Sequence, residues 1–115
     1  MFVTKEFEFA AAHFLTNYHG KCENLHGHTY KLAVTLKAKP DENGIAYDFG
    51  DIKKRVKKEV IDILDHASLN DIIGEHPSAE NISVWVWGKL ETHLPLYEVS
   101  VWESPTSYVT YRGDR

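Results

Sequence analysis

The sequence predicts an α+β domain, a four-stranded antiparallel sheet with two helices on one face, in the order β-β-α-α-β-β. Apolar residues alternate with period two toward both ends of the chain and recur at helical spacing in the middle. Clusters of Gly, Pro, Asn and Asp separate these segments. With 115 residues, the chain is long enough for one domain and not two, so we expect a single domain over residues 1–115.

Two strands are predicted in the N-terminal part of the chain. Residues 2–13 place two glutamates on one face, and the other face carries Phe7, Phe9, Ala11 and His13. Residues 26–38 alternate in the same way, and one face carries His26, His28, Tyr30, Leu32, Val34 and Leu36. Because successive side chains of a strand point to opposite faces, each set lies on one side of the sheet.

Two helices are predicted in the middle of the chain. The stretch DFGDIKKRVKKEVIDILDH begins at the candidate N-cap Asp48, and its apolar stripe comprises Ile52, Val56, Val60 and either Ile63 or Leu64. The second helix begins at Ser78 and runs to about His93, with a stripe of Ile82, Val86 and Leu90. The run SVWVW inside it would also suit a strand, but the cap before it and GKLETHL after it favour a helix.

Two further strands are predicted after these helices. Residues 97–103 alternate, so that Glu103 shares a face with Val99 and Val101. Residues 107–112 predict the last strand. A carboxylate on an apolar strand face is costly unless it is paired, which makes Glu103 a residue of interest.

Composition and charge exclude several classes of protein. A net charge of -4 and a pI of about 5.9 argue against a general binder of nucleic-acid phosphates, so we expect no nucleic-acid partner. No apolar run reaches the ~18 residues of a membrane span, and the N-terminus lacks the pattern of a secretory signal. One cysteine cannot form an intramolecular disulfide. We therefore expect a cytoplasmic protein that does not bind membranes.

Three histidines on apolar strand faces are candidate metal ligands. His26 and His28 are two residues apart, so a strand points both imidazoles the same way, and His13 lies on the apolar face of the preceding strand. Three imidazoles and an open fourth position form the ligand set of a catalytic zinc site. A single histidine on an apolar face is more often a core residue, but three of them beside a nearby thiol favour a metal site.

The single cysteine, Cys22, has two interpretations. It is either a fourth metal ligand or a catalytic thiol that stays free beside the metal. Its position in a loop favours reactivity, because structural cysteines are mostly buried. A nearby zinc ion or cationic histidine would lower the pKa of this thiol and give a thiolate near neutral pH.

Asp65, His66 and Glu103 are further candidates. A carboxylate next to an imidazole can fix its tautomer and stabilise its charged form, although Asp65 and His66 are also compatible with an ordinary charged helix end. Glu103 is suited to accept two hydrogen bonds from a flat heterocycle that bears an amine and a ring N–H. It is equally compatible with a pair to Lys or Arg, or with a strand end in water.

Several segments together resemble the 6-pyruvoyl-tetrahydropterin synthase family, in the same order and over nearly the whole chain. They are FEFAAAHF, CENLHGHTY, YDFGDIKK, LDHASLN, HPSAENISVWVW and VWESPTSYVTYRG. The three-residue gap between Cys22 and His26 resembles the carboxytetrahydropterin-forming branch, since the biopterin-forming branch has a longer insertion there. Glu23 is similar in position to a glutamate that a folate-pathway branch uses instead of the cysteine. A lyase forming 6-hydroxymethyl-dihydropterin and a 6-pyruvoyl-tetrahydropterin synthase are therefore the alternatives.

The resemblance implies a fold, a reaction and a set of site residues. The implied enzyme is a zinc-dependent carbon–carbon lyase that converts 7,8-dihydroneopterin triphosphate to 6-carboxytetrahydropterin, acetaldehyde and triphosphate. Its implied residues are the zinc ligands His13, His26 and His28, the catalytic Cys22, Asp65 and His66, and the pterin-binding Glu103. The implied tunnelling fold joins sheets into a trimeric barrel and stacks barrels as a hexamer, which places active sites at subunit interfaces.

Overall fold

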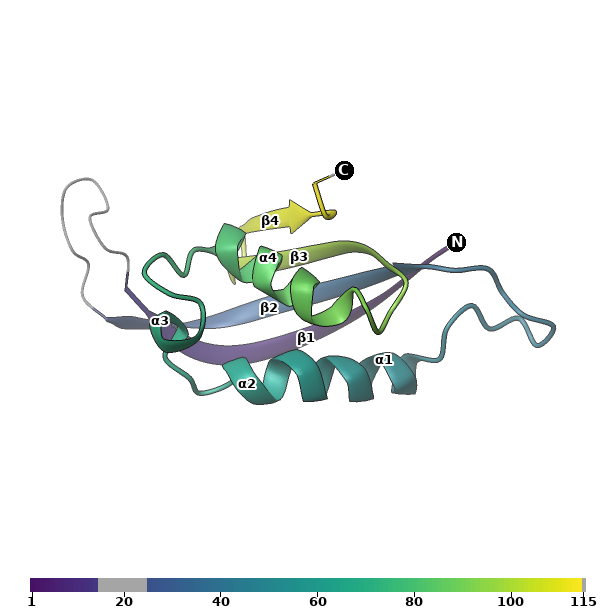
Figure 1. Cartoon of the computed structure of the whole chain (residues 1–115), viewed down its shortest axis with the longest axis horizontal. Helices are drawn as coiled ribbons and strands as arrows, with labels where there is room; N and C mark the ends of the chain where they lie inside the picture. The colour runs from purple at the N-terminus through teal and green to yellow at the C-terminus, as the bar shows by residue number, and fades with distance from the viewer. Residues whose placement is uncertain (15–24, 115) are drawn as a thin grey trace.

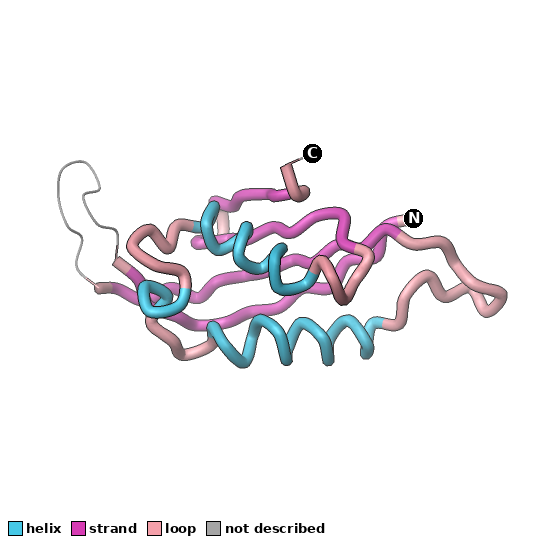
Figure 2. Tube along the Cα trace, viewed as in Figure 1, coloured by secondary structure: helices cyan, strands magenta, loops and turns pink. Residues whose placement is uncertain are grey.

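A four-stranded antiparallel sheet forms one layer of the computed structural model, which describes residues 1–14 and 25–114 (Figure 1). In spatial order its strands are β1 (Phe2–His13), β2 (His26–Lys37), β3 (Leu96–Ser104) and β4 (Ser107–Tyr111). The helical elements are α1 (Phe49–Val56), the π-helical turn η1 (Lys57–Ile61), α2 (Asp62–Leu64), α3 (Leu69–Ile72) and α4 (Ala79–Leu90). The helices cover one face of the sheet (Figure 2), which confirms the predicted fold class.

The strand predictions agree with the structure to within one residue at each end. β1 has the predicted bounds, whereas β2 and β4 each end one residue earlier and β3 extends one residue further at both ends. In the β1–β2 ladder, His13 pairs with His26, Ala11 with His28 and Phe9 with Tyr30. The predicted apolar faces of both strands therefore meet on the side covered by the helices.

The first predicted helix is correct in its start but not in its end. The Asp48 carboxylate caps α1 by accepting hydrogen bonds from the amides of Gly50 (2.6 Å) and Asp51 (3.2 Å). The helical segment ends at Leu64 instead of continuing to His66, because Asp65 adopts an extended conformation. Leu64 is fully buried, so it completes the apolar stripe and the alternative residue Ile63 stays 38% exposed.

The π-helical turn η1 explains which of these two residues is buried. In an uninterrupted α-helix with 3.6 residues per turn, Ile63 would lie about 20° from Ile52 around the helix axis, and Leu64 about 120° away. A π-turn closes its hydrogen bonds over one residue more than an α-turn. The turn at Lys57–Ile61 therefore returns Leu64 to the buried stripe and sets the position of the next residue, Asp65.

The second predicted helix is α4. The Ser78 hydroxyl accepts a hydrogen bond from the Asn81 amide (3.1 Å), as expected of an N-cap. The helix ends at Leu90, earlier than the predicted end near His93, and its buried stripe contains Ile82, Val86 and Leu90. The short helix α3 was not predicted, because four residues are too few to show a helical period. None of the helices in the described part of the chain is long and apolar enough to cross a bilayer.

Candidate metal centre and active site

Three histidines converge where β1 and β2 pair at one end of the sheet. His13 is 1% exposed, His28 is half-buried and His26 is exposed. One candidate ligand atom from each residue lies within 4.8 Å of the other two. The imidazole centroids are 4.8–4.9 Å apart with interplanar angles of 72–90°, so the rings meet edge to face. The predicted cluster therefore exists, and a single ion could contact all three residues after small ring rotations.

The buried ligand candidate His13 has a defined hydrogen-bond environment. Its Nδ1 lies 2.9 Å from the carbonyl oxygen of Pro77 and 3.2 Å from the hydroxyl oxygen of Tyr30. A carbonyl oxygen can only accept, so Nδ1 carries the proton and donates it to Pro77. The lone pair of His13 is then on Nε2, which is the protonation state that metal binding requires. This donor set, three imidazoles including one fixed tautomer, fits a zinc ion.

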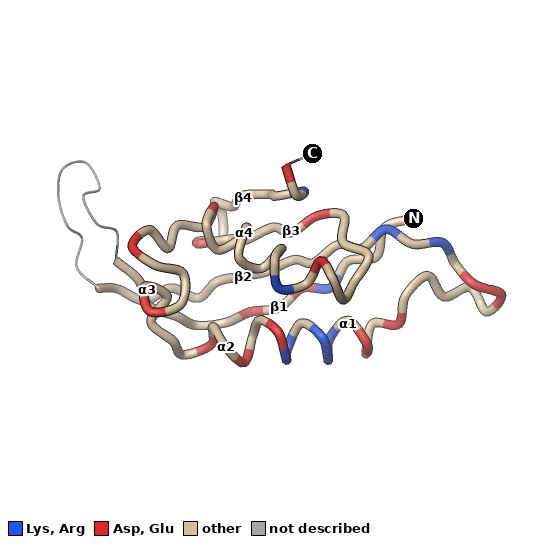
Figure 3. The backbone as a smooth tube through the Cα atoms, viewed as in Figure 1, with Lys and Arg blue, Asp and Glu red and all other residues tan. Residues whose placement is uncertain are grey.

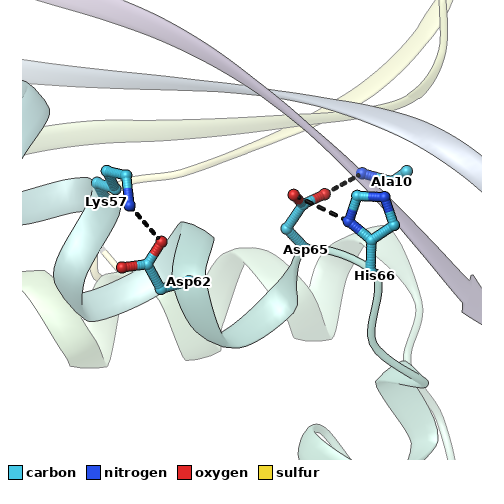
Figure 4. Close-up of polar contacts among 5 residues, drawn as sticks. All are labelled: Ala10, Lys57, Asp62, Asp65 and His66. Atoms are coloured by element: carbon cyan, nitrogen blue, oxygen red, sulfur yellow. Dashed lines mark hydrogen bonds and ion pairs between the residues drawn. The ribbon is translucent and has the colours of Figure 1, made fainter.

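Asp65 and His66 lie together against the edge of β1 (Figure 4). One Asp65 oxygen accepts a hydrogen bond from the Ala10 amide (2.9 Å), and the other lies 3.1 Å from His66 Nδ1. The bond from the Ala10 amide and the neighbouring His66 hold the pKa of the Asp65 carboxyl below its usual value, although partial desolvation opposes them. Asp65 is therefore ionised near neutral pH, orients the imidazole and leaves His66 Nε2 facing solvent, since this side chain is 83% exposed.

The backbone of His66 is strained. Its φ angle is 59°, in the left-handed region that residues other than glycine rarely occupy. The His66 amide donates to the Ala10 carbonyl oxygen (2.6 Å), so that β1 holds this conformation in place. Strained residues of this kind are concentrated at functional sites, which supports a role for His66 in the site.

The segment after His66 continues along the edge of β1. The Ala12 amide donates to the Ala67 carbonyl oxygen (3.1 Å). The Asn70 side chain then bonds the backbone of Phe14 twice, accepting from its amide and donating to its carbonyl oxygen, both at 3.0 Å. The motif LDHASLN is thus fixed to the end of β1 that carries His13. Sequence reasoning had assigned no role to Asn70 or Pro77, since both act on residues distant in the sequence.

Glu103 lies beside the histidine cluster. One of its oxygens is 3.4 Å from His28 Nε2, and a pocket of about 570 Å³ is lined by both residues together with Tyr30 and Trp102. Burial, followed by the nearby Glu103 carboxylate, raises the pKa of the Tyr30 phenol, so its hydroxyl stays protonated. A neighbouring pocket of about 440 Å³ is lined by His28 and His66. Glu103 and His66 therefore open onto two adjoining pockets that share His28.

Cys22 and Glu23 lie outside the described residues, so their predicted roles stay predictions. His19, which the sequence offers as a reserve metal ligand or base because it is close to Cys22, lies in the same segment. The described ends of that segment, Phe14 and Leu25, border the histidine cluster in the sequence.

Comparison with known proteins agrees with this geometry. The family model for 6-pyruvoyl tetrahydropterin synthase matches residues 2–114. The chain is 40% identical to the 6-carboxy-5,6,7,8-tetrahydropterin synthase of Synechocystis over 121 residues, which cover 98% of this chain and 94% of that protein. It is 34% identical to the Haemophilus influenzae protein of the same name over 137 residues, covering 96% and 97% of the two chains.

A solved structure shows the same fold. The 6-pyruvoyl tetrahydropterin synthase of Caenorhabditis elegans superposes with a TM-score of 0.87 at 28% identity, covering 99% of this chain and 96% of that one. Sequence and structure thus agree on a pterin-synthase fold with a histidine cluster at one end of the sheet. The chain belongs to the 6-pyruvoyl tetrahydropterin synthase family.

Proposed function

We propose that this chain is a zinc-dependent 6-carboxy-5,6,7,8-tetrahydropterin synthase, a carbon–carbon lyase acting on 7,8-dihydroneopterin triphosphate. The observation that carries the proposal is similarity at 34–40% identity, over at least 94% of both chains, to proteins with that name. The three-residue gap between Cys22 and His26 supports the same branch. Acetaldehyde and triphosphate are the other products.

The zinc ion would be held by His13, His26 and His28, the cluster whose ligand atoms lie within 4.8 Å of one another. When bound, zinc supplies Lewis acidity that polarises substrate oxygens and acidifies neighbouring C–H and O–H groups. The fixed tautomer of His13 supports this assignment, because it leaves Nε2 available as a ligand.

The remaining residues divide into groups that bind the pterin and groups that move protons. Glu103 accepts hydrogen bonds from the pterin amine and ring N–H, which places the substrate side chain near His28. His66 exchanges a proton through Nε2 while the ionised Asp65 holds its Nδ1–H. The Cys22 thiolate is the second group that moves a proton to or from the side chain.

The charges around the site support an oligomer with shared active sites. In the described part of the chain, Lys31 is the only Lys or Arg lining the two pockets, and its amine lies 3.2 Å from the Glu6 carboxylate. In Figure 3 the other basic positions lie along the helices, around the N-terminal end of β1 and near the C-terminus, away from this site. A triphosphate needs several cations, so a trimer or hexamer in which a neighbouring subunit supplies basic residues is the arrangement we propose.

Product identification tests the proposed reaction. Purified zinc-loaded protein is incubated with 7,8-dihydroneopterin triphosphate, and the pterin products are identified by mass spectrometry. We expect 6-carboxytetrahydropterin and acetaldehyde. Accumulation of 6-pyruvoyl-tetrahydropterin or 6-hydroxymethyl-dihydropterin in its place would reject this branch assignment in favour of one of the other two.

Three variants separate the proposed roles. Cys22→Ala should retain zinc and pterin binding and lose turnover, whereas loss of zinc would make Cys22 a ligand. His28→Ala should lose zinc in metal analysis, and full retention would contradict the three-histidine site. Glu103→Gln should keep zinc and weaken pterin binding by at least about tenfold, since one charge-assisted hydrogen bond is worth roughly 1.5–3 kcal/mol. Glu98→Gln, on the same strand but paired with Arg112 (2.8 Å), is the matched control.

A further inference from the structure

We propose that the turn at the start of α4, residues 76–78 with Asn81, is a positioning device that fixes His13 as an Nε2 metal ligand. The proposal rests on the metal site of the proposed function. In this proposal the motif HPSAEN supports the metal ligand in addition to beginning α4. Pro77, Asn81 and Tyr30 are the residues that carry it.

The Pro77 carbonyl oxygen is the group that acts directly on the ligand. It accepts the Nδ1 proton of His13 at 2.9 Å, and both residues are buried. In a buried site this hydrogen bond is not exchanged for one to water, so it fixes both the tautomer and the rotation of the ring. The Tyr30 hydroxyl oxygen, 3.2 Å from the same nitrogen and fully buried, accepts a share of that proton and closes the pocket around it.

Asn81 holds this carbonyl in place. Its side-chain amide donates to the His76 carbonyl oxygen at 2.7 Å, and its backbone amide donates to the Ser78 hydroxyl at 3.1 Å. The Ser78 amide also donates to the His76 carbonyl oxygen (2.9 Å). Residues on both sides of Pro77 are therefore tied to the first turn of α4, and the direction of the Pro77 carbonyl follows from that turn.

The proposal predicts the tautomer of His13 in the metal-free protein. Long-range ¹H–¹⁵N NMR spectra of the unmodified, ¹⁵N-labelled chain should show His13 protonated at Nδ1. Protonation at Nε2 would overturn the proposal. Since this measurement uses no variant and no pterin, it is independent of the reaction the enzyme catalyses.

The variant Asn81→Asp tests the contribution of the turn. An aspartate in the first turn of a helix suits the helix dipole, yet its ionised carboxylate cannot donate to the His76 carbonyl. Competition with a fluorescent zinc chelator should show zinc affinity about tenfold weaker than in the unmodified chain, as is typical when a group supporting a metal ligand is lost. One zinc per chain should still bind at saturation.

Ser83→Ala is the matched control for this variant. It removes the hydrogen bond from the Ser83 hydroxyl, two residues further along α4, to the Glu80 carbonyl oxygen (2.6 Å), and should leave zinc affinity unchanged. Equal zinc affinity in Asn81→Asp and the unmodified chain would overturn the role of Asn81. A chain that binds zinc as predicted but forms a different pterin would refute the proposed reaction and leave the positioning role standing.

Discussion

Replacing Leu64 with alanine should destabilise the protein far more than replacing its neighbour Ile63. Leu64 is fully buried at the end of α2, whereas Ile63 is 38% exposed. Substitution of a buried leucine by alanine removes its burial and leaves a cavity, at a cost of about 2–5 kcal/mol. For Ile63→Ala we expect a smaller loss, of about 1 kcal/mol, because this side chain is 38% exposed and part of the surface that is removed already faces solvent.

This difference depends on the π-helical turn η1, since a regular α-helix would bury Ile63 instead. Urea denaturation followed by circular dichroism measures both losses. Both variants are measured with a metal chelator and at one fixed protein concentration, so that metal binding and subunit assembly do not contribute to the free energy of unfolding. Equal losses, or a larger loss for Ile63→Ala, would refute the proposed role of η1 and the position it gives to Asp65.

Three further predictions concern other parts of the same framework. Asp48→Ala removes the N-cap of α1 and should cost about 1 kcal/mol in urea denaturation, while Asp51→Ala, which caps nothing, should cost less. Because the pKa of Asp65 is lowered on folding, its contribution to stability is complete above the unfolded pKa of about 3.9 and is lost as the pH falls through the lower folded value. Asp65→Asn should therefore flatten the stability profile in that acidic range, and an unchanged profile would contradict this linkage. His66→Gly relieves the backbone strain of a left-handed residue that is not glycine, about 1–2 kcal/mol, so stability should change little. Turnover should be lost, and full turnover would exclude His66 from catalysis.

Most of the fold could be predicted because each strand carries a clear period. Apolar and polar residues alternate over most of residues 2–13 and 26–38, and the apolar face of each strand contributes to the buried core. The end of the first helix could not be predicted in this way. Its apolar pattern is compatible with Ile63 or Leu64, and only packing against the sheet, through η1, decides between them.

The histidine cluster could also be predicted from the sequence, for a related reason. His26 and His28 share a face by strand geometry alone, and a hairpin brings His13 opposite His26. The groups that support these ligands could not be predicted from the sequence in the same way. Pro77 lies 64 residues from His13, and Asn70 lies 56 residues from Phe14. No local period links such pairs, so their contacts appear only once the helices are placed on the sheet.

These supporting contacts converge on residues 10–14, which are the end of β1 and the residue that follows it. Asp65 and His66 bond the backbone of Ala10, Asn70 bonds Phe14, and the Pro77 carbonyl bonds the side chain of His13. The metal ligand and the proposed acid–base pair are thus held by one strand and not by separate loops. Since neighbouring residues of a paired strand cannot shift independently, the distance between these groups is set by the sheet.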